Sequence, residues 1–194
     1  MKDLKKQRGS PDLEVLILRM AQGDTQALAA FYEETKTSVY AFAVSILADR
    51  HGAEDVMQET YLKAYEGAGS YRAMGKPLAW LLTITKNFAR MRLRTERGGD
   101  GELDESLAAP GFEGGVLDRL TLQAALGALS QEERQIVTLH AIAGLKHREI
   151  GEWMGLALPT VLSKYRRALS KLKKTWKEED DEKDEYGEPP KGNR

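Results

Sequence analysis

The stretch GLKHREIGEWMGLALPTVLSKYRRALSKLKK, residues 144–174, contains two helical patterns separated by a glycine. The first runs from His147 to Met154 with apolar residues at helical spacing. Gly155 follows, and because it has no Cβ it supplies the permissive backbone that a turn needs. Pro159 then suits the first turn of a second helix, where no backbone N–H is needed. This pattern predicts a helix-turn-helix.

Apolar and small residues inside this stretch support the same interpretation. Ile150 and Met154 are expected to face inward from the first helix, and Gly151 lies where two helices must approach closely. We expect Leu156 and Leu158 to anchor the turn. The stretch should therefore form a small packed unit rather than two isolated helices.

The second helix, expected over residues 159–176, has two distinct faces. The apolar face should pack on the core and consists of Val161, Tyr165, Ala168, Leu172 and Trp176. The polar and basic face consists of Thr160, Ser163, Lys164, Arg167, Lys171 and Lys174. A recognition helix needs such a face, with early residues at base edges and later Lys and Arg at phosphates. The alternative is an ordinary amphipathic helix with a basic solvated face.

From Leu13 to Leu93 the pattern is helical throughout, because apolar residues recur three and four positions apart and no run alternates as a strand would. We expect a first helix that includes Leu16, and three more at about residues 26–47, 53–66 and 77–94. The sequence therefore predicts an all-α first lobe.

Glycines and capping residues indicate where these helices end. Gly23 is an expected stop, and Asp24 or Thr25 the N-cap of the next helix. The segment DRHG, residues 49–52, should be the break between the second and third helices. Gly67 is expected to end the third.

Charge and composition divide the chain into four parts: residues 1–95, 96–115, 116–176 and 177–194. The segment of residues 97–115 is rich in glycine and acidic residues, which favours a flexible linker over a long loop. Beyond it we expect helices at about residues 116–128, 130–143, 147–154 and 159–176. The acidic tail has almost no apolar residues, so we expect it to be disordered. The two lobes have an excess of Lys and Arg, as nucleic-acid-binding domains do.

Several classes of function are excluded or disfavoured. The chain has no cysteine, so disulfides, thiolate metal sites and a cysteine nucleophile are excluded. The three histidines, His51, His140 and His147, have no metal-ligand spacing, and we expect no metal or cofactor. The longest apolar stretch, AFAVSILA, is far shorter than the roughly 20 residues that span a bilayer. We expect a soluble cytoplasmic protein without membrane insertion.

The segment AEDVMQETYLKAY, residues 53–65, places several polar groups on an otherwise core-like helix. Its inward stripe is Ala53, Val56, Met57, Thr60, Tyr61 and Ala64. A second stripe faces outward and consists of Asp55, Gln58, Glu59 and Leu62. It could be an acid/base site, a solvated helix face or a docking surface for a basic partner. Docking is favoured because no histidine or nucleophile accompanies the carboxylates, and because it also explains Leu62.

The helix of residues 79–94 follows a short loop and has a basic face of its own. Lys86, Arg90 and Arg94 recur every four residues with Asn87 beside them, opposite an apolar side that includes Trp80. The preceding loop contributes Tyr71, Arg72 and Lys76. Such residues beside a loop could capture a single strand with an unstacked base. A core helix with a solvated basic face is equally compatible with the pattern.

Taken together, AEDVMQETYLKAY, then KPLAWLLTITKN, then residues 129–174 resemble the extracytoplasmic-function (ECF) group of bacterial RNA polymerase sigma factors. The resemblance covers most of residues 13–176 and consists of two independent motifs in the family's order. It implies an all-α, two-domain promoter-recognition subunit that directs promoter melting and transcription initiation without catalytic residues of its own. The implied partners are core RNA polymerase, promoter DNA and, commonly in this family, an anti-sigma factor.

The resemblance also assigns roles to positions in this chain. Asp55, Gln58, Glu59 and Leu62 match the contact with core polymerase. The residues implied at the minus-ten promoter element are Tyr71, Arg72, Lys76, Trp80, Lys86, Asn87, Arg90 and Arg94. Those implied at the minus-thirty-five element are Pro159, Thr160, Ser163, Lys164, Arg166, Arg167 and Lys171.

This chain departs from the family pattern at several DNA-facing positions. Leu162 stands where the family often has Lys, Met91 where it often has Asp, and the loop has Ala73, Met74 and Gly75 in place of an acidic pattern. These departures concern the promoter sequence rather than the class of protein.

The sequence alone leaves two rival functions open. A free-standing helix-turn-helix regulator explains residues 121–176 but gives the other lobe no role. A helical hydrolase would use Glu54, Asp55 and Glu59, for which no substrate is evident. A further hypothesis is that the tail, residues 178–188, competes with DNA for the basic faces; a solubilising role is the simpler alternative.

Overall fold

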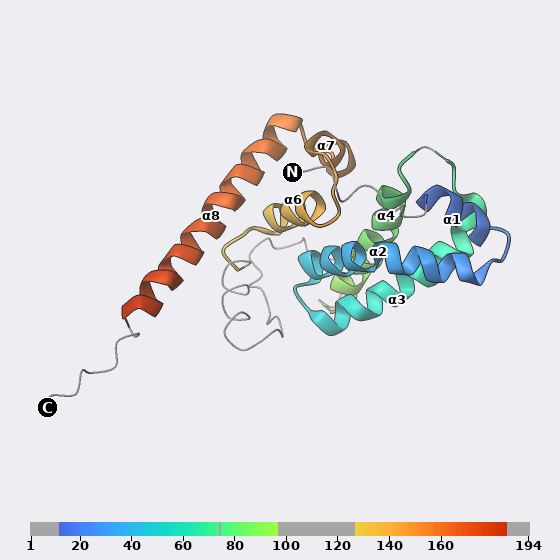
Figure 1. Ribbon diagram of the computed structural model, residues 1–194, viewed down its shortest axis with the longest axis horizontal. Helices are drawn as coiled ribbons and strands as arrows, with labels where there is room; N and C mark the ends of the chain where they lie inside the picture. Colours follow the sequence, from blue (N-terminus) through green and yellow to red (C-terminus); the bar gives the residue numbers. More distant parts are fainter. Residues whose placement is uncertain (1–11, 74, 97–126, 186–194) are drawn as a thin grey trace, which may run out of the picture. The chain divides into compact units, whose positions relative to one another are not determined.

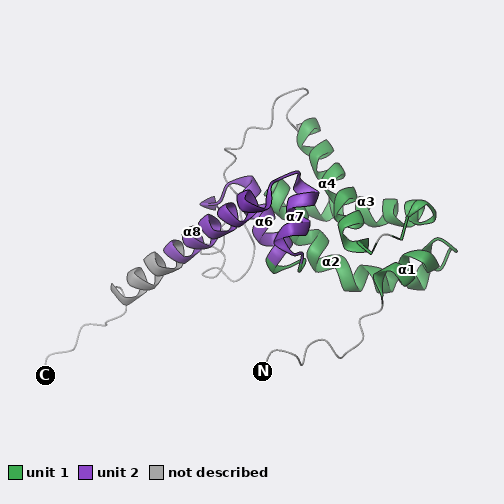
Figure 2. Ribbon diagram, turned by 90° about the horizontal axis from the view of Figure 1, so that it is seen from above, with its two compact units in different colours: residues 1–101, 141–144 green, residues 102–140, 145–194 purple. Residues whose placement is uncertain are grey.

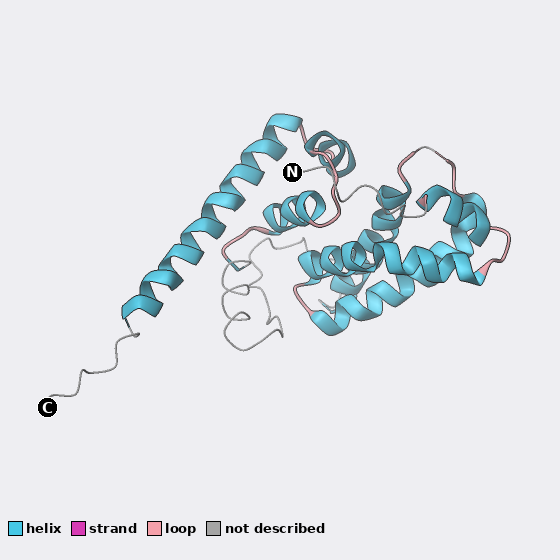
Figure 3. Cartoon of the chain, in the orientation of Figure 1, coloured by secondary structure: helices cyan, strands magenta, loops and turns pink. Residues whose placement is uncertain are grey.

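The structure is a computed structural model that describes residues 12–73, 75–96 and 127–185. Every regular element in these ranges is a helix (Figures 1 and 3). The helices divide into two compact units, coloured separately in Figure 2. The predicted all-α class with two helical units is therefore confirmed. Apart from Glu96, the expected linker lies outside the described residues.

Within its described residues, the first unit contains four α-helices and one short 3-10 helix. Its elements are α1 (Leu13–Met20), α2 (Thr25–Leu47), α3 (Arg50–Gly67), η1 (Ala68–Ser70) and α4 (Pro77–Glu96). The helices α2, α3 and α4 pack against one another, and α1 lies against α2 (Figure 1). This arrangement leaves one face of α3 and one face of α4 toward solvent.

Large apolar side chains form the core of this unit. Phe31, Phe42 and Val39 of α2 are fully buried, as are Leu81 and Leu82 of α4. The inward stripe predicted for the third helix is confirmed: Ala53, Val56, Thr60, Tyr61 and Ala64 are buried and Met57 is half-buried. Helical periodicity therefore identified the buried side of α3 correctly.

Aspartates cap the first three helices, which is why those helices begin where they do. The Asp12 carboxylate accepts the Glu14 N–H, and Asp24 accepts from the first turn of α2. Asp49 accepts the Gly52 N–H at 2.6 Å and caps α3. Of the two expected caps, Asp24 and Thr25, the structure has Asp24. The expected break over residues 49–52 is wrong, because the Asp49 cap starts α3 at Arg50 and places Gly52 inside its first turn.

The second unit contains α6 (Gln131–Ala141), α7 (His147–Met154) and α8 (Leu158–Glu185). The bounds expected for α7 are confirmed, and the helix expected over residues 116–128 lies almost wholly outside the described residues. The prediction that the last helix ends at Trp176 is wrong, because the backbone of α8 continues to Glu185. Glu and Lys are good helix formers, so an acidic segment with nothing to bury can still extend a helix. Residues 186–194 of the expected tail lie outside the described residues.

The second unit packs the apolar face of α8 against α6 and α7. Ile136, Leu139, Ile150, Val161 and Ala168 are fully buried. Leu172 is buried and Tyr165 half-buried, so these predicted core positions of α8 are confirmed. Leu158 does not anchor the turn as expected, because it is 41% exposed at the first position of α8.

Candidate nucleic-acid and protein interfaces

The turn between α7 and α8 depends on two glycines. Gly155 has a φ of +72°, in the left-handed region that favours glycine. A Cβ at Gly151 would lie 2.8 Å from the carbonyl oxygen of Leu156 and 3.5 Å from the Val161 side chain. The Leu156 N–H donates to the Gly151 carbonyl at 2.9 Å. The two glycines therefore fix how α7 meets α8, as the sequence predicted.

The outward side of α8 holds the residues predicted to contact the minus-thirty-five element, which we call the α8 face. Its members are Pro159, Thr160, Ser163, Lys164, Arg166, Arg167 and Lys171. Pro159, Ser163 and Arg166 are exposed, and Thr160 is half-buried. Within the described part of the chain, Arg166 has no hydrogen-bond or ion-pair partner. The early residues of the helix are therefore open to a ligand.

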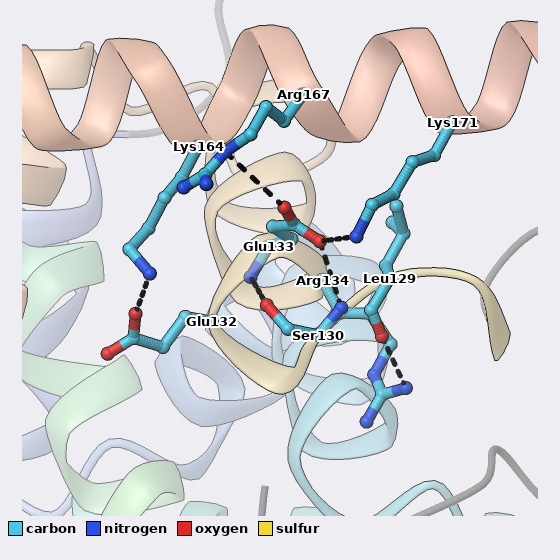
Figure 4. A network of polar contacts seen from close by, with 8 residues as sticks. All are labelled: Leu129, Ser130, Glu132, Glu133, Arg134, Lys164, Arg167 and Lys171. Atoms are coloured by element: carbon cyan, nitrogen blue, oxygen red, sulfur yellow. Dashed lines mark hydrogen bonds and ion pairs between the residues drawn. The ribbon is translucent and has the colours of Figure 1, made fainter. Parts of the chain in front are cut away.

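Three basic members of the α8 face are bound by carboxylates of α6 (Figure 4). Lys164 pairs with Glu132 at 2.5 Å, and its side chain is only 23% exposed. Lys171 donates to Glu133 Oε2 at 2.7 Å, while Arg167 Nε lies 3.9 Å from Glu133 Oε1. The sequence did not predict these pairs, because the partners lie more than 30 positions apart. The α8 face is thus partly neutralised within its own unit.

Glu133 also caps the helix from which it comes. Its carboxylate accepts the Ser130 N–H at 3.0 Å, and its own N–H donates to Ser130 Oγ at 3.3 Å, which makes a capping box. Burial disfavours the charged form, but Lys171 and the Ser130 N–H outweigh it, so the pKa of Glu133 is lowered. Glu133 is therefore an ionised, almost fully buried link between α6 and α8. The S-x-x-E spacing of the box was visible in the sequence and was missed.

Two histidines and a tyrosine meet beside the turn. The rings of His140 and His147 are 4.0 Å apart between centroids, and Tyr165 packs edge-on against both. His140 Nδ1 donates to the Leu145 carbonyl at 2.8 Å, which fixes its tautomer. Burial, together with the nearby His140, lowers the pKa of His147. The cluster is a packing contact between α6, α7 and α8 that separation in the sequence concealed.

The residues predicted to dock on a basic partner form the exposed α3 face: Asp55, Gln58, Glu59 and Leu62. Leu62 is 66% exposed, the largest value among the exposed large apolar residues of the described chain. Gln58 and Glu59 are exposed and have no polar partner within the described residues. Asp55 differs, because Arg92 of α4 donates to it at 2.7 Å. Three of the four residues are therefore free to contact another molecule.

The residues predicted to contact the minus-ten element lie on α4 and on the loop before it. Asn87, Arg90 and Arg94 are exposed on one side of α4, whereas Lys86 is half-buried. Burial, with the nearby Arg90, lowers the pKa of Lys86. The structure thus brings these four residues to one side of the helix, as their spacing predicted.

The loop residues are divided between the core and the surface. Tyr71 and Trp80 pack edge-to-face at 5.1 Å between ring centroids and join the apolar core. The Tyr71 hydroxyl donates to Glu14 of α1 at 2.7 Å. Arg72 and Lys76 are exposed. Tyr71 and Trp80, both predicted to contact DNA, therefore also pack in the first unit. The contact with Glu14 was not predicted from the sequence.

The described residues contain no group of three or more acidic or histidine side chains placed to hold a metal ion. None of the described helices is long and apolar enough to cross a membrane.

Two protein-family models match the chain, one for each unit. The Sigma-70 region 2 family matches residues 31–98, and the Sigma-70, region 4 family matches residues 119–172. The first match covers α3 and α4, and the second covers the helix-turn-helix. The two motifs therefore match separate regions of one family in the order found here.

Curated relatives match most of the chain. The ECF RNA polymerase sigma factor SigK of Mycobacterium ulcerans is 32% identical over 174 residues, covering 84% of this chain and 93% of the relative. SigK of Mycobacterium bovis strain BCG is 32% identical over 181 residues, covering 86% and 94%.

Solved structures resemble the chain as well. CnrH, determined in complex with the cytosolic domain of CnrY, has a TM-score of 0.61 at 22% identity, covering 86% of this chain and 98% of CnrH. The sigma factor RpoE of Bartonella quintana, determined with the anti-sigma factor NepR, has a TM-score of 0.57 at 30% identity, covering 76% and 96%. The CnrH match supports the fold alone.

Proposed function

The chain belongs to the ECF group of RNA polymerase sigma factors, and we propose which of its surfaces binds the polymerase and which bind promoter DNA. It is an RNA polymerase sigma factor that directs promoter recognition. Sigma factors are non-catalytic initiation subunits, and we assign no catalytic residue to this chain. We therefore treat its sites as binding surfaces. We also propose that the chain acts in the cytoplasm, together with the polymerase.

The α3 face is the proposed contact with core RNA polymerase. The observation that supports it best is the exposed group of Gln58, Glu59 and Leu62 on an otherwise well-packed helix. An apolar side chain beside unpaired polar acceptors suits a basic protein surface with an apolar pocket. Asp55 has a smaller role, because Arg92 already holds it. We place this contact in the domain of residues 1–95.

Promoter DNA is the proposed ligand of the other two surfaces. The minus-ten element lies against the loop of residues 71–76 and the basic side of α4. The α8 face reads the minus-thirty-five element from the domain of residues 116–176, with Ser163 and Arg166 at the front because both are exposed. Promoter opening is driven by tighter binding of the separated strand than of the duplex.

An anti-sigma factor is a further proposed partner. RpoE, at 30% identity, was determined in complex with such a factor. A protein that covers the α3 face would exclude the polymerase, so competition between the two is the simplest form of inhibition.

Co-elution with core polymerase on size exclusion tests the α3 assignment. We expect Glu59→Lys to weaken binding by at least about tenfold, because it opposes a basic partner with a like charge. The matched control is Glu34→Lys, which makes the same charge change at an exposed position of α2. Asp55→Lys is a less direct test, since it also breaks the pair with Arg92. Equal affinities of Glu59→Lys and the parent chain would contradict the assignment.

A further inference from the structure

Glu14 of α1 holds the loop that precedes α4. One carboxylate oxygen, Oε1, accepts two hydrogen bonds: from the Tyr71 hydroxyl at 2.7 Å and from the Gly75 N–H at 2.8 Å. The two donors lie at opposite ends of the segment 71–75, and both are about 60 positions from Glu14 in sequence. A single side chain therefore ties the two ends of this loop to a separate helix.

The position of Glu14 is itself well fixed. Its N–H donates to the N-cap Asp12 at 3.0 Å, so it lies in the capped first turn of α1. Leu16 and Ile17 of the same helix are buried in the core. A carboxylate near a helix N-terminus is also favoured by the helix dipole. The acceptor is thus presented from a rigid element rather than from a mobile surface side chain.

The loop has features that make an external anchor useful. Gly75 has a φ of +69°, in the left-handed region that favours glycine, and its N–H donates to Glu14. At the other end, Tyr71 packs against Trp80 of α4. Arg72 is exposed between these anchors and has no partner within the described residues. The anchors therefore restrict the backbone from which a free guanidinium extends.

We propose that Glu14 is a positioning residue that preorganises the described loop residues on either side of position 74, residues 71–73 and 75–76, for an unstacked promoter base. This inference rests on the proposed function of the loop. An ordered loop loses less conformational entropy when the strand binds, so the anchor strengthens capture without touching DNA. The anchor should therefore affect binding of the opened strand but not duplex binding by the α8 face, which belongs to the other unit.

The test uses the holoenzyme, formed from the full chain and core polymerase. The probe is a fluorescent single-stranded oligonucleotide that the parent holoenzyme selects from a random pool. We expect Glu14→Ala to weaken its binding about fivefold to tenfold. Glu14→Gln should retain most of the affinity, because an amide oxygen can accept both hydrogen bonds. The matched control, Glu34→Ala, should bind as the parent does.

A double-mutant cycle separates positioning from a general loss of structure. Tyr71→Phe removes the hydroxyl that donates to Glu14 and keeps the ring against Trp80. Its effect on strand binding should largely disappear in the Glu14→Ala background, since the bond it removes is already lost there. Affinity for core polymerase should stay unchanged in every variant.

Three outcomes would overturn the inference. Equal strand affinity of Glu14→Ala and the parent would remove the role of Glu14, as would a Tyr71→Phe effect that is the same in both backgrounds. If the parent holoenzyme selects no single strand, the proposed function of the loop fails, and the inference fails with it. Failure of the loop's proposed function appears in the parent chain itself, whereas failure of the Glu14 role appears only when variants are compared with a parent that binds the strand. The two failures are therefore distinguishable.

Discussion

The α3 face and the α8 face differ in how much of their charge the protein already uses. On the α3 face, Gln58 and Glu59 have no polar partner among the described residues, and only Asp55 is paired. On the α8 face, three basic side chains are bound by Glu132 and Glu133 (Figure 4). The α3 face can therefore bind a partner without losing most of its internal contacts. On the α8 face, Lys164, Arg167 and Lys171 must give up ion pairs with α6 before they can bind phosphates.

The difference shows that a charged stripe in the sequence does not reveal which of its charges are free. Lys164 and Arg166 are both basic members of the α8 face, and they lie near its opposite edges because two positions turn an α-helix by about 200°. The structure buries most of Lys164 against Glu132 and leaves Arg166 exposed. Their expected contributions to DNA binding therefore differ.

The largest predicted effect is on the free energy of unfolding, and it concerns one glycine in each of the two units. In the α8 unit, Gly151→Ala would place a Cβ 2.8 Å from the backbone carbonyl of Leu156. In the α3 unit, Gly52→Ala would meet the Asp49 and Arg92 side chains at 2.6 and 2.8 Å. Backbone cannot move aside as readily, so we expect Gly151→Ala to cost about 1–3 kcal/mol of unfolding free energy and Gly52→Ala to cost less. Denaturant unfolding of each variant measures both.

Gly69→Ala serves as the control for that comparison, since Gly69 is exposed and a Cβ added there would meet nothing within 4 Å. Its unfolding free energy should stay close to that of the parent. A Gly151→Ala chain as stable as Gly69→Ala would contradict the close packing of the turn.

Arg166→Ala should weaken duplex binding more than Lys164→Ala does. An exposed arginine that neutralises a phosphate contributes about one unit to the slope of log affinity against log salt. Lys164 must first leave Glu132, so its loss should change the slope less. Titrations of a promoter duplex at several salt concentrations give both slopes. A larger change for Lys164→Ala would reverse the comparison.

Glu132→Gln tests directly whether internal pairing masks the α8 face. Without the carboxylate, Lys164 becomes available to DNA, so duplex affinity should rise by a factor of a few and its salt dependence should steepen by up to about one unit. Glu152→Gln on α7 removes a carboxylate from the same unit away from this pair. If both variants bind equally, the Glu132 pair does not restrain Lys164.

The smallest predicted effect is a pH dependence confined to the second unit. The pKa of His147 is lowered in the folded state by burial and by His140. The stability that neutral His147 contributes is therefore present above its unfolded pKa of about 6.5 and is lost as pH falls through the folded value. NMR titration of the ring protons should place the His147 midpoint below 6.5. A midpoint above 6.5 would contradict the burial and the ring contact.

Local signals in the sequence predicted much of the fold. Asp24 was one of two residues expected as the cap after Gly23, and Gly155 was expected to supply the permissive backbone of the turn between two helical patterns. Periodicity alone gave the buried stripe of α3. These features depend on neighbours within a turn or two of helix, where spacing determines the structure.

Features that join distant segments could not be predicted in the same way. The bond from Tyr71 to Glu14 and the pairs between Glu133 and α8 link positions far apart in the chain. Single-sequence patterns carry no register between such helices. The exposure of Leu158 was not predicted either, because its hydrophobicity suggested an anchor, whereas it is 41% exposed at the first position of α8.

A sigma factor makes core polymerase start at specific promoters, and transcription that depends on the chain measures this activity itself. Purified core polymerase would transcribe genomic DNA fragments from the bacterium that encodes the chain, with and without the protein, and RNA 5′ ends would be sequenced. We predict new starts that share two upstream sequence elements and that disappear with Glu59→Lys. Duplex binding by the chain alone, without any new start in the presence of core polymerase, would show that the chain does not act as a sigma factor.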